Sequence, residues 1–414
     1  MDKKSTTAKA RKAMKEVKCR RNELKNKKSA KLAKSEIKEG KTYESNIALN
    51  LQLPSNMANS DPLQTLESIT NEQHQRYEKL VPQVRIKQNN CIQYDESKTY
   101  KFILFDTETT TMGKAAEICQ LSAIDDVGQN EFSCYLMPES NVSKHATEIN
   151  KLEIFKVNGE RVLYHQGQPV QSSSLKEAQV SFINYINKVS TNDKEMKECI
   201  PVLVGHNAMT FDIPILLRTS IPPFMTKLKR LNVHFGDSLI LAKQILKGER
   251  PALRLSDNTF SKASLGCLHS TLFDQSFPAH DALEDVKALR RILFESNLTL
   301  TSEIIVSKSN VMSCENALAV VQHMDLSYDR FQRFMGNLHN PDKNRSVISK
   351  SMANKIAESG MTFTDLVALF RQGGCEGIIA VLGLPPTTMR TSKPRVTKNR
   401  RILNAICSYF VSSV

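Results

Sequence analysis

Residues 100–109 read YKFILFDTET, an apolar run that ends on two acidic residues. A short apolar run bounded by polar residues predicts a buried β-strand. Side chains two positions apart on a strand point to the same face, so Asp106 and Glu108 should lie side by side where the strand ends. Crowded carboxylates repel each other unless a cation lies between them. Taken alone the pair is a weak signal, because two unrelated loop acids would look the same.

A further acid follows a second short apolar run. Residues 205–212 read GHNAMTFD and lead into a predicted helix at 213–218. Asp212 lies directly before that helix, where it could equally serve as the N-cap. His206 and Asn207 have an ordinary interpretation as strand-end and turn residues that bond backbone groups, and we favour it for His206.

The third stretch combines a histidine with three acids. Residues 280–285 read HDALED. Asp281 and Glu284 have the spacing of a capping box, which predicts that a helix begins directly after Asp281 and gives both acids a structural role. Asp285 would then lie in the first helical turn, where the helix dipole favours an anion. His280 would precede the helix, in a loop that could approach a substrate.

The elements around these stretches begin with a hairpin and then alternate between strands and helices. This order predicts an α/β fold in which helices flank a mixed sheet. The predicted strands are 100–105, 117–125, 131–137 and 201–204, and the predicted helices are 174–189, 213–218, 237–246 (with Asp237 as its N-cap), 264–273 and 282–296.

The last part of the chain gives weaker signals. We expect a linker at 299–345 and a small helical region of unknown role at 346–414. Within that region, Thr362 and Asp365 have the spacing of a helix start, and the pair Gly373–Gly374 is typical of a helix end. A final helix is predicted at 401–410, after a basic run that reads most simply as a solvated surface.

The positive charge of the chain is concentrated at its start. The 414 residues carry a net charge of +14, of which residues 1–41 contribute 16 basic and 5 acidic side chains, or +11. Because this segment has too little apolar surface to offset the entropy of ordering, we expect residues 1–97 to be a basic disordered tail followed by a polar connector. The tail could be merely solvated, or it could act in nuclear import or grip nucleic acid.

The cysteines indicate the compartment. Nine are scattered along the chain without a Cys-x-x-Cys pair, which argues against a zinc cluster or a disulfide framework and favours a reducing environment. No apolar signal core opens the sequence, and no uninterrupted apolar run approaches 18 residues. We therefore expect a nuclear or cytoplasmic protein that is neither secreted nor inserted in a membrane.

Together the three acidic stretches resemble a known family. Asp106-Thr-Glu108, the run from Gly205 to Asp212 and His280-x₄-Asp285 match, in order and rough separation, the motifs of the DEDDh 3′→5′ exonucleases, which include proofreading subunits and three-prime repair exonucleases. The resemblance covers residues 98–298. It implies a ribonuclease H-like exonuclease domain over that range and hydrolysis of nucleic acid to nucleoside monophosphates.

The resemblance also implies roles for individual residues. Two Mg²⁺ ions, replaceable by Mn²⁺, would be held by the four acids, and His280 would act as general base. The implied metal ligands are Asp106, Glu108, Asp212 and Asp285. The implied substrate contacts are Thr107, Thr109, Met112, His206 and Asn207. Met112 takes the place where such enzymes often carry an aliphatic wedge.

The sequence leaves the class of substrate undecided. Single-stranded DNA 3′ ends are favoured, and RNA 3′ ends are the first alternative, because nothing in the sequence identifies which groups would meet a 2′-hydroxyl. A non-catalytic interaction module that retains the fold is the second alternative, although it has no reason to keep crowded acids. Nucleic acid is the expected partner, a membrane is not, and homodimer formation is left open.

Overall fold

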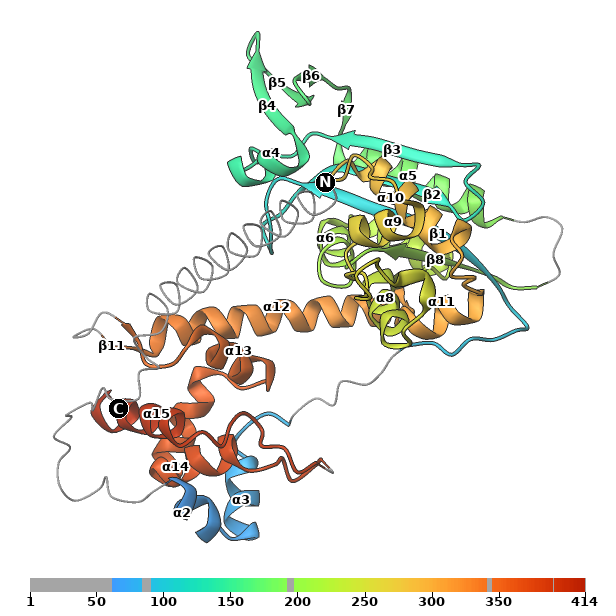
Figure 1. Ribbon diagram of the computed structural model, residues 1–414. Coiled ribbons are helices and arrows are strands. Elements are labelled where there is room, and N and C mark those ends of the chain that lie inside the picture. The colour runs from blue at the N-terminus through green and yellow to red at the C-terminus, as the bar shows by residue number, and fades with distance from the viewer. Residues whose placement is uncertain (1–61, 84–90, 192–196, 341–344, 390, 414) are drawn as a thin grey trace, which may run out of the picture. The chain divides into compact units, whose positions relative to one another are not determined.

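The computed structural model describes residues 62–83, 91–191, 197–340, 345–389 and 391–413 (Figure 1). The basic tail and Arg390 lie outside these ranges, so the expectations for them remain predictions.

A seven-stranded mixed sheet forms the centre of the predicted exonuclease domain (Figure 1). Its strand order is β10-β9-β8-β1-β2-β3-β7. The long strand β1 pairs antiparallel with β2 and parallel with β8. Strand β2 pairs antiparallel with β3, as the predicted hairpin requires. The strands are β1 (Thr99–Thr109), β2 (Ile118–Asp125), β3 (Glu131–Leu136), β7 (Ser172–Ser173), β8 (Cys199–Gly205), β9 (His234–Asp237) and β10 (Met312–Ser313).

Helices cover both faces of this sheet. Along β1, Ile103 and Phe105 belong to one apolar cluster, while Phe102 and Leu104 belong to another. The period of two in a strand explains this division, because successive side chains point to opposite faces. The first cluster includes side chains from α5 (Leu175–Ser190), α6 (Asp212–Thr219) and α7 (Pro222–Arg230). The second includes side chains from α8 (Ser238–Lys247), α9 (Leu265–Phe273), α10 (Ala282–Arg290) and α11 (Ser302–Lys308). The predicted ribonuclease H-like α/β fold is confirmed.

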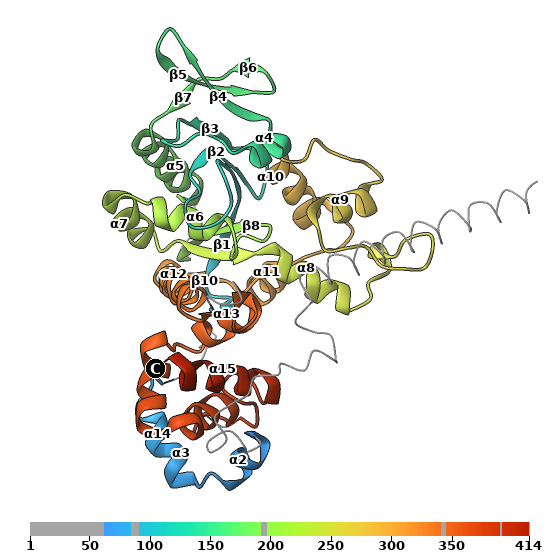
Figure 2. The same ribbon diagram turned by 90° about the vertical axis from the view of Figure 1, so that its left-hand side faces the viewer.

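A small sheet is inserted between β3 and β7, where the sequence analysis predicted no element. It consists of β4 (Leu152–Val157), β5 (Glu160–His165) and β6 (Gln168–Pro169) and follows the short helix α4 (Lys144–Asn150). Figure 2 shows it beyond the β3 side of the main sheet. Leu152 of β4 and Leu163 of β5 are completely buried in a cluster with Cys119 of β2, and this packing attaches the insert to the domain.

The segment expected as a linker, 299–345, contains helices α11 and α12. Helix α12 (Cys314–Asn337) is 24 residues long and carries few buried side chains for its length. Ala317 and Val321 pack in a core with the main sheet, while Phe334 packs with the C-terminal helices. Its apolar positions are too sparse for the pattern to be recognised as one helix.

The C-terminal region is helical, as expected. It contains α13 (Lys350–Glu358), α14 (Phe363–Gly383) and α15 (Arg400–Ser413). The predicted capping box of Thr362 and Asp365 is confirmed. The predicted stop at Gly373–Gly374 is confirmed: the backbone is non-helical at Gly374, with φ 57° and ψ −147°, and a second helix follows this kink within α14. Arg395, from the basic run expected on the surface, has a side chain only 2% exposed, 3.9 Å from Glu78.

Judged by length and composition alone, helix α14 is long and apolar enough to cross a membrane. Half of its most apolar window is buried by protein, and Leu366, Leu369 and Ile378 lie in the core of the C-terminal helices. A core helix of a soluble protein satisfies the same test, so α14 adds little support for a membrane span.

The expected polar connector contains two more helices, α2 (Pro62–Ser68) and α3 (Asn71–Glu78). Both pack on α14, where glycines make room for their larger side chains. A Cβ atom on Gly373 would lie 2.3 Å from Tyr77 Cε1, and one on Gly383 would lie 2.7 Å from Leu66 Cδ2. Residues 62–78 thus complete the C-terminal helical core.

The glycine contact gives a stability prediction. Gly373→Ala should lower the free energy of unfolding by about 1–3 kcal/mol, because Tyr77 would have to move. Gly336→Ala is the matched control: this helical glycine has open space around its missing Cβ, so alanine should stabilise by about 0.5–1 kcal/mol. Urea unfolding of both variants measures the difference. Equal effects of the two substitutions would show that α3 does not pack on α14 in solution.

Candidate active site

The end of β1 supplies the first two acids of the candidate site. Asp106 lies opposite Ser122 and Glu108 opposite Gln120 on β2, and the register shifts immediately after Glu108. Both side chains retain partial contact with water. The strand period places them on one face, as predicted.

Asp212 approaches from the start of α6 and is 2% exposed. Its Oδ1 accepts hydrogen bonds from the Thr107 backbone N–H (3.0 Å) and from Thr107 Oγ1 (2.6 Å). Two expectations change here. Phe211, not Asp212, occupies the N-cap position of the helix. Thr107, expected to contact substrate, instead uses both its donors to hold Asp212 against β1.

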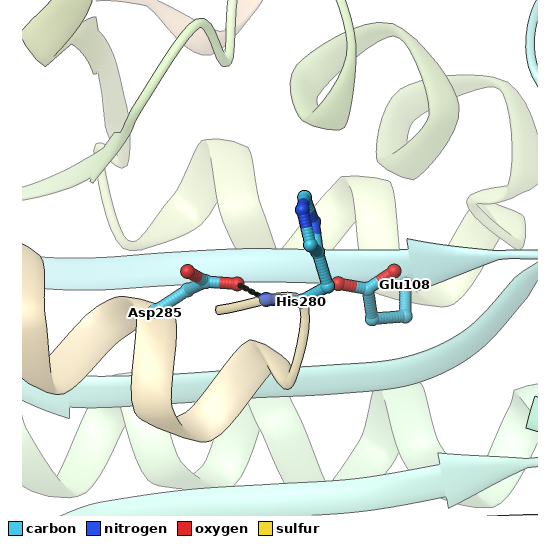
Figure 3. A group of neighbouring side chains, drawn as sticks. All are labelled: Glu108, His280 and Asp285. Atoms are coloured by element: carbon cyan, nitrogen blue, oxygen red, sulfur yellow. Dashed lines mark hydrogen bonds between the residues drawn. The ribbon is translucent and has the colours of Figure 1, made fainter. Parts of the chain in front are cut away.

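His280 and Asp285 come from the start of α10. The backbone N–H of His280 donates to Asp285 Oδ2 at 2.9 Å, a bond that Figure 3 shows together with Glu108. His280 adopts a left-handed conformation with φ 70°, and its side chain is exposed. One ligand atom each from Glu108, His280 and Asp285 lies within 4.8 Å of the others. These three residues can therefore meet around one small ion or reacting group.

The helix start after Asp281 is confirmed, but its cap differs from the expected box. Asp281 Oδ1 accepts from the Leu283 N–H at 3.0 Å, one position earlier than a capping box would use. Glu284 forms an ion pair with Lys287 at 3.5 Å. Asp281 thus has its predicted capping role through a different N–H, whereas Glu284 forms an ion pair in place of the predicted capping bond.

Burial raises the pKa of each of the four acids of the site, and the charges of neighbouring acids add to the rise. Although Asp106 keeps some exposed area, protein surrounds it closely, and this burial, followed by the charges of Asp212, Asp285 and Glu108, raises its pKa well above the usual range. Burial also raises the pKa of Glu108 to about 8 and that of Asp212 to about 7. Burial raises the pKa of Asp285 to about 6, although the His280 N–H opposes the rise. Asp106 thus lies near enough to the other three acids for their charges to raise its pKa, and a cation would relieve this repulsion.

The other residues that were expected to contact substrate lie in different environments. Met112 is 72% exposed, so its side chain is free to meet a ligand. Thr109 is buried and donates to the carbonyl of Thr111 at 2.8 Å. His206 lies 3.0 Å from Ser238 Oγ and lines a small apolar cavity. The His206 ring is thus held by other groups of the domain.

Asn207 is exposed, with φ 66°, in a loop fixed by Asp237. The Asp237 carboxylate accepts from the backbone N–H groups of Asn207 (3.0 Å) and Met209 (3.1 Å). It also accepts from the Leu239 N–H at 2.8 Å, which confirms its predicted role as N-cap of α8.

Sequence reasoning missed residues contributed by the insert. Asn150 is buried at the end of α4; its amide donates to the Thr109 carbonyl at 3.2 Å and opposes the rise in the Glu108 pKa. An open hollow of about 420 Å³ extends from His280, within the size range of small-ligand pockets. Its lining residues are Ile149, Asn150, Lys151, His165, Gln166, Pro278, Ala279, His280 and Asp281. No periodic pattern marks this insert, so it could not be predicted from the sequence.

The raised pKa values predict how stability depends on pH. An acid whose pKa is raised on folding contributes stability below its unfolded pKa, near 4, and loses that contribution as the pH rises through the folded value. Glu108, with a folded pKa of about 8, should therefore destabilise the metal-free chain increasingly between about pH 4 and pH 8.

Glu108→Gln should accordingly raise the melting temperature in EDTA by about 2–4 °C near pH 8 and by much less near pH 5. Calorimetric or fluorescence melting of both chains across this pH range makes the comparison, and the difference between them cancels all other titrating groups. Mn²⁺ should stabilise the wild-type chain more than the variant. A variant less stable than the wild-type chain near pH 8 without metal would contradict the repulsion inferred here.

Comparisons with known proteins give matches to different parts of the chain. A model of the PML C-terminal domain family matches residues 344–413, and no curated protein matches the chain. Among solved structures, E. coli exonuclease I in complex with a dT13 oligonucleotide is 16% identical, with 58% of this chain and 45% of that one covered and a TM-score of 0.31. Exonuclease X in complex with 5′-overhanging duplex DNA is 18% identical, with 50% and 99% covered and a TM-score of 0.30.

The zinc-bound form of E. coli exonuclease I with single-stranded DNA is 14% identical, with 62% of this chain and 50% of that one covered and a TM-score of 0.34. This chain spans about half the length of the exonuclease I structures that it matches. A likeness this distant decides nothing about the activity of the chain, which has to be argued from its own residues.

Proposed function

We propose that this chain is a metal-dependent 3′→5′ exonuclease that hydrolyses single-stranded DNA ends to nucleoside monophosphates. The observation that carries the proposal is the burial of Asp106 within range of the charges of Glu108, Asp212 and Asp285, whose own pKa values are raised to about 8, 7 and 6. A protein gains nothing in stability from such a cluster, so a bound cation is its simplest explanation.

The residues present fit divalent cations. Carboxylate oxygens are the ligands that Mg²⁺ and Mn²⁺ prefer, and four acids supply enough charge for two ions. Asp106, Glu108 and Asp285 would hold one ion, while Asp106 and Asp212 would hold the other, directly or through water. When bound, paired divalent cations stabilise the attacking and leaving oxygens of a phosphodiester during in-line displacement.

The side chains of the protein would have separate roles in the reaction. Thr107 fixes the Asp212 carboxylate through two hydrogen bonds, so the acid does not reorient during the reaction. His280, exposed beside Glu108 and Asp285, would accept the proton of the attacking water as general base. The hollow beside His280 would receive the terminal nucleotide. Met112, which is exposed and follows Glu108 closely in the sequence, would be the wedge.

A paired assay tests the proposal. Purified chain with Mg²⁺ or Mn²⁺ is given matched 5′-labelled DNA and RNA single strands. We expect a ladder that shortens from the 3′ end, faster on DNA, and no products in EDTA. A ladder on RNA alone would transfer the proposal to RNA ends. Internal cuts, or no cleavage with either metal, would refute it.

A further inference from the structure

One buried side chain connects the strand that faces Glu108 to the loop that carries His280. Gln120 lies on β2 opposite Glu108 and is 1% exposed. Its Nε2 donates to Asp281 Oδ1 at 3.1 Å, and its Oε1 accepts from the Ala282 N–H at 3.2 Å. The amide thus holds two consecutive residues, at the start of α10, from a strand about 160 positions earlier in the chain.

These hydrogen bonds restrict the conformation of the loop before α10. Asp281 is also held by the Leu283 N–H, so its side chain is fixed from both the sheet and its own helix. The preceding residue, His280, has a left-handed backbone that a non-glycine residue adopts only when its surroundings impose it. The His280 N–H in turn donates to Asp285, so both proposed site residues depend on the same attachment.

We infer that Gln120 is a positioning residue, which sets His280 relative to Glu108 by fastening the start of α10 to β2. The inference rests on the proposed function insofar as it concerns catalysis. The Gln120 amide bonds to Asp281 and Ala282, and its effect on His280 passes through these two residues. Losing its amide should therefore misplace the base without removing any reacting group.

The chain offers a matched control. Gln179 on α5 is also 1% exposed and makes the same two kinds of bond elsewhere. Its Nε2 donates to the Thr219 carbonyl at 3.0 Å, and its Oε1 accepts from the Ile221 N–H at 3.0 Å. A substitution to methionine, of similar shape but without an amide, removes the acceptor of one backbone N–H at both positions, that of Ala282 and that of Ile221. It also removes the donor to the Asp281 carboxylate at one position and to the Thr219 carbonyl at the other, so both variants should lose stability.

The first test is kinetic. Gln120→Met should lower kcat on a labelled single strand by about 10- to 100-fold with KM within about threefold, whereas Gln179→Met should stay within about threefold of the wild-type kcat. In a His280→Ala background, Gln120→Met should cost less than about threefold, because the base it positions is absent. Equal kcat for the two methionine variants, or full additivity with His280→Ala, would overturn the inference.

The second test needs no activity. Hydrogen–deuterium exchange should show faster exchange of the peptide spanning 280–285 in Gln120→Met, and of the peptide spanning 219–223 in Gln179→Met. Unchanged exchange at 280–285 would overturn the attachment even if catalysis changed. If the wild-type chain proved inactive, the proposed function would fail, while the exchange result would still decide whether Gln120 fixes this loop.

Discussion

Asp106→Asn should abolish hydrolysis while leaving the protein folded and, without metal, more stable. Asparagine keeps the shape of the side chain but removes the charge that both proposed ions would share. We expect kcat to fall by roughly 10⁴-fold, which corresponds to about 5 kcal/mol of lost transition-state stabilisation. Because the raised pKa of Asp106 reflects burial among three other acids, the neutral side chain should also raise the melting temperature in EDTA above neutral pH.

Asp125→Asn is the control for that variant. Asp125 is 1% exposed at the opposite end of β2, and its carboxylate accepts from the backbone N–H groups of Gln129 and Asn130 at 2.8 and 3.2 Å. Although burial opposes them, these bonds hold its pKa below the usual range, so its asparagine variant should lose stability and keep its activity. Asp106→Asn should thus lose activity and gain melting temperature, whereas Asp125→Asn should keep its activity and lose melting temperature. Wild-type hydrolysis by Asp106→Asn would remove this acid from the site.

His280→Ala should reduce kcat by about 10²- to 10⁴-fold, the usual contribution of a general base. Mn²⁺ affinity, measured by calorimetry, should stay within about threefold of the wild-type value. This second measurement matters because His280 lies close enough to Glu108 and Asp285 to serve as a ligand instead. A large loss of Mn²⁺ affinity would show that His280 is a metal ligand.

The control for His280→Ala is His145→Ala. His145 is an exposed histidine on α4, so its removal tests whether loss of any surface imidazole slows the reaction. We expect no change in kcat beyond about twofold. A comparable loss in both variants would mean that His280 acts through general charge or stability, not as the base.

The residues that could be predicted from the sequence are those whose signal is local. The apolar run before Asp106, the cap of α8 by Asp237 and the start of α10 after Asp281 each depend on neighbours a few positions away. That the four acids would share one site was implied only by the resemblance of the three acidic stretches to the exonuclease motifs, and not by any local signal.

What could not be predicted depends on contacts between distant segments. Thr107 was expected to meet substrate because nothing near it in the sequence indicates that Asp212, 105 positions away, takes both its donors. The helices α2 and α3 read as polar because their apolar side chains are few and fit against glycines of α14, about 300 positions later. The long helix α12 was missed for a similar reason: different parts of it pack in different cores.

The most direct test of the proposed metal site is anomalous diffraction from a crystal of the chain soaked in Mn²⁺. We expect manganese density in contact with Asp106, Glu108 and Asp285, and a second peak between Asp106 and Asp212. A well-ordered site in which these four carboxylates bind no manganese at saturating concentration would contradict the metal-dependent mechanism.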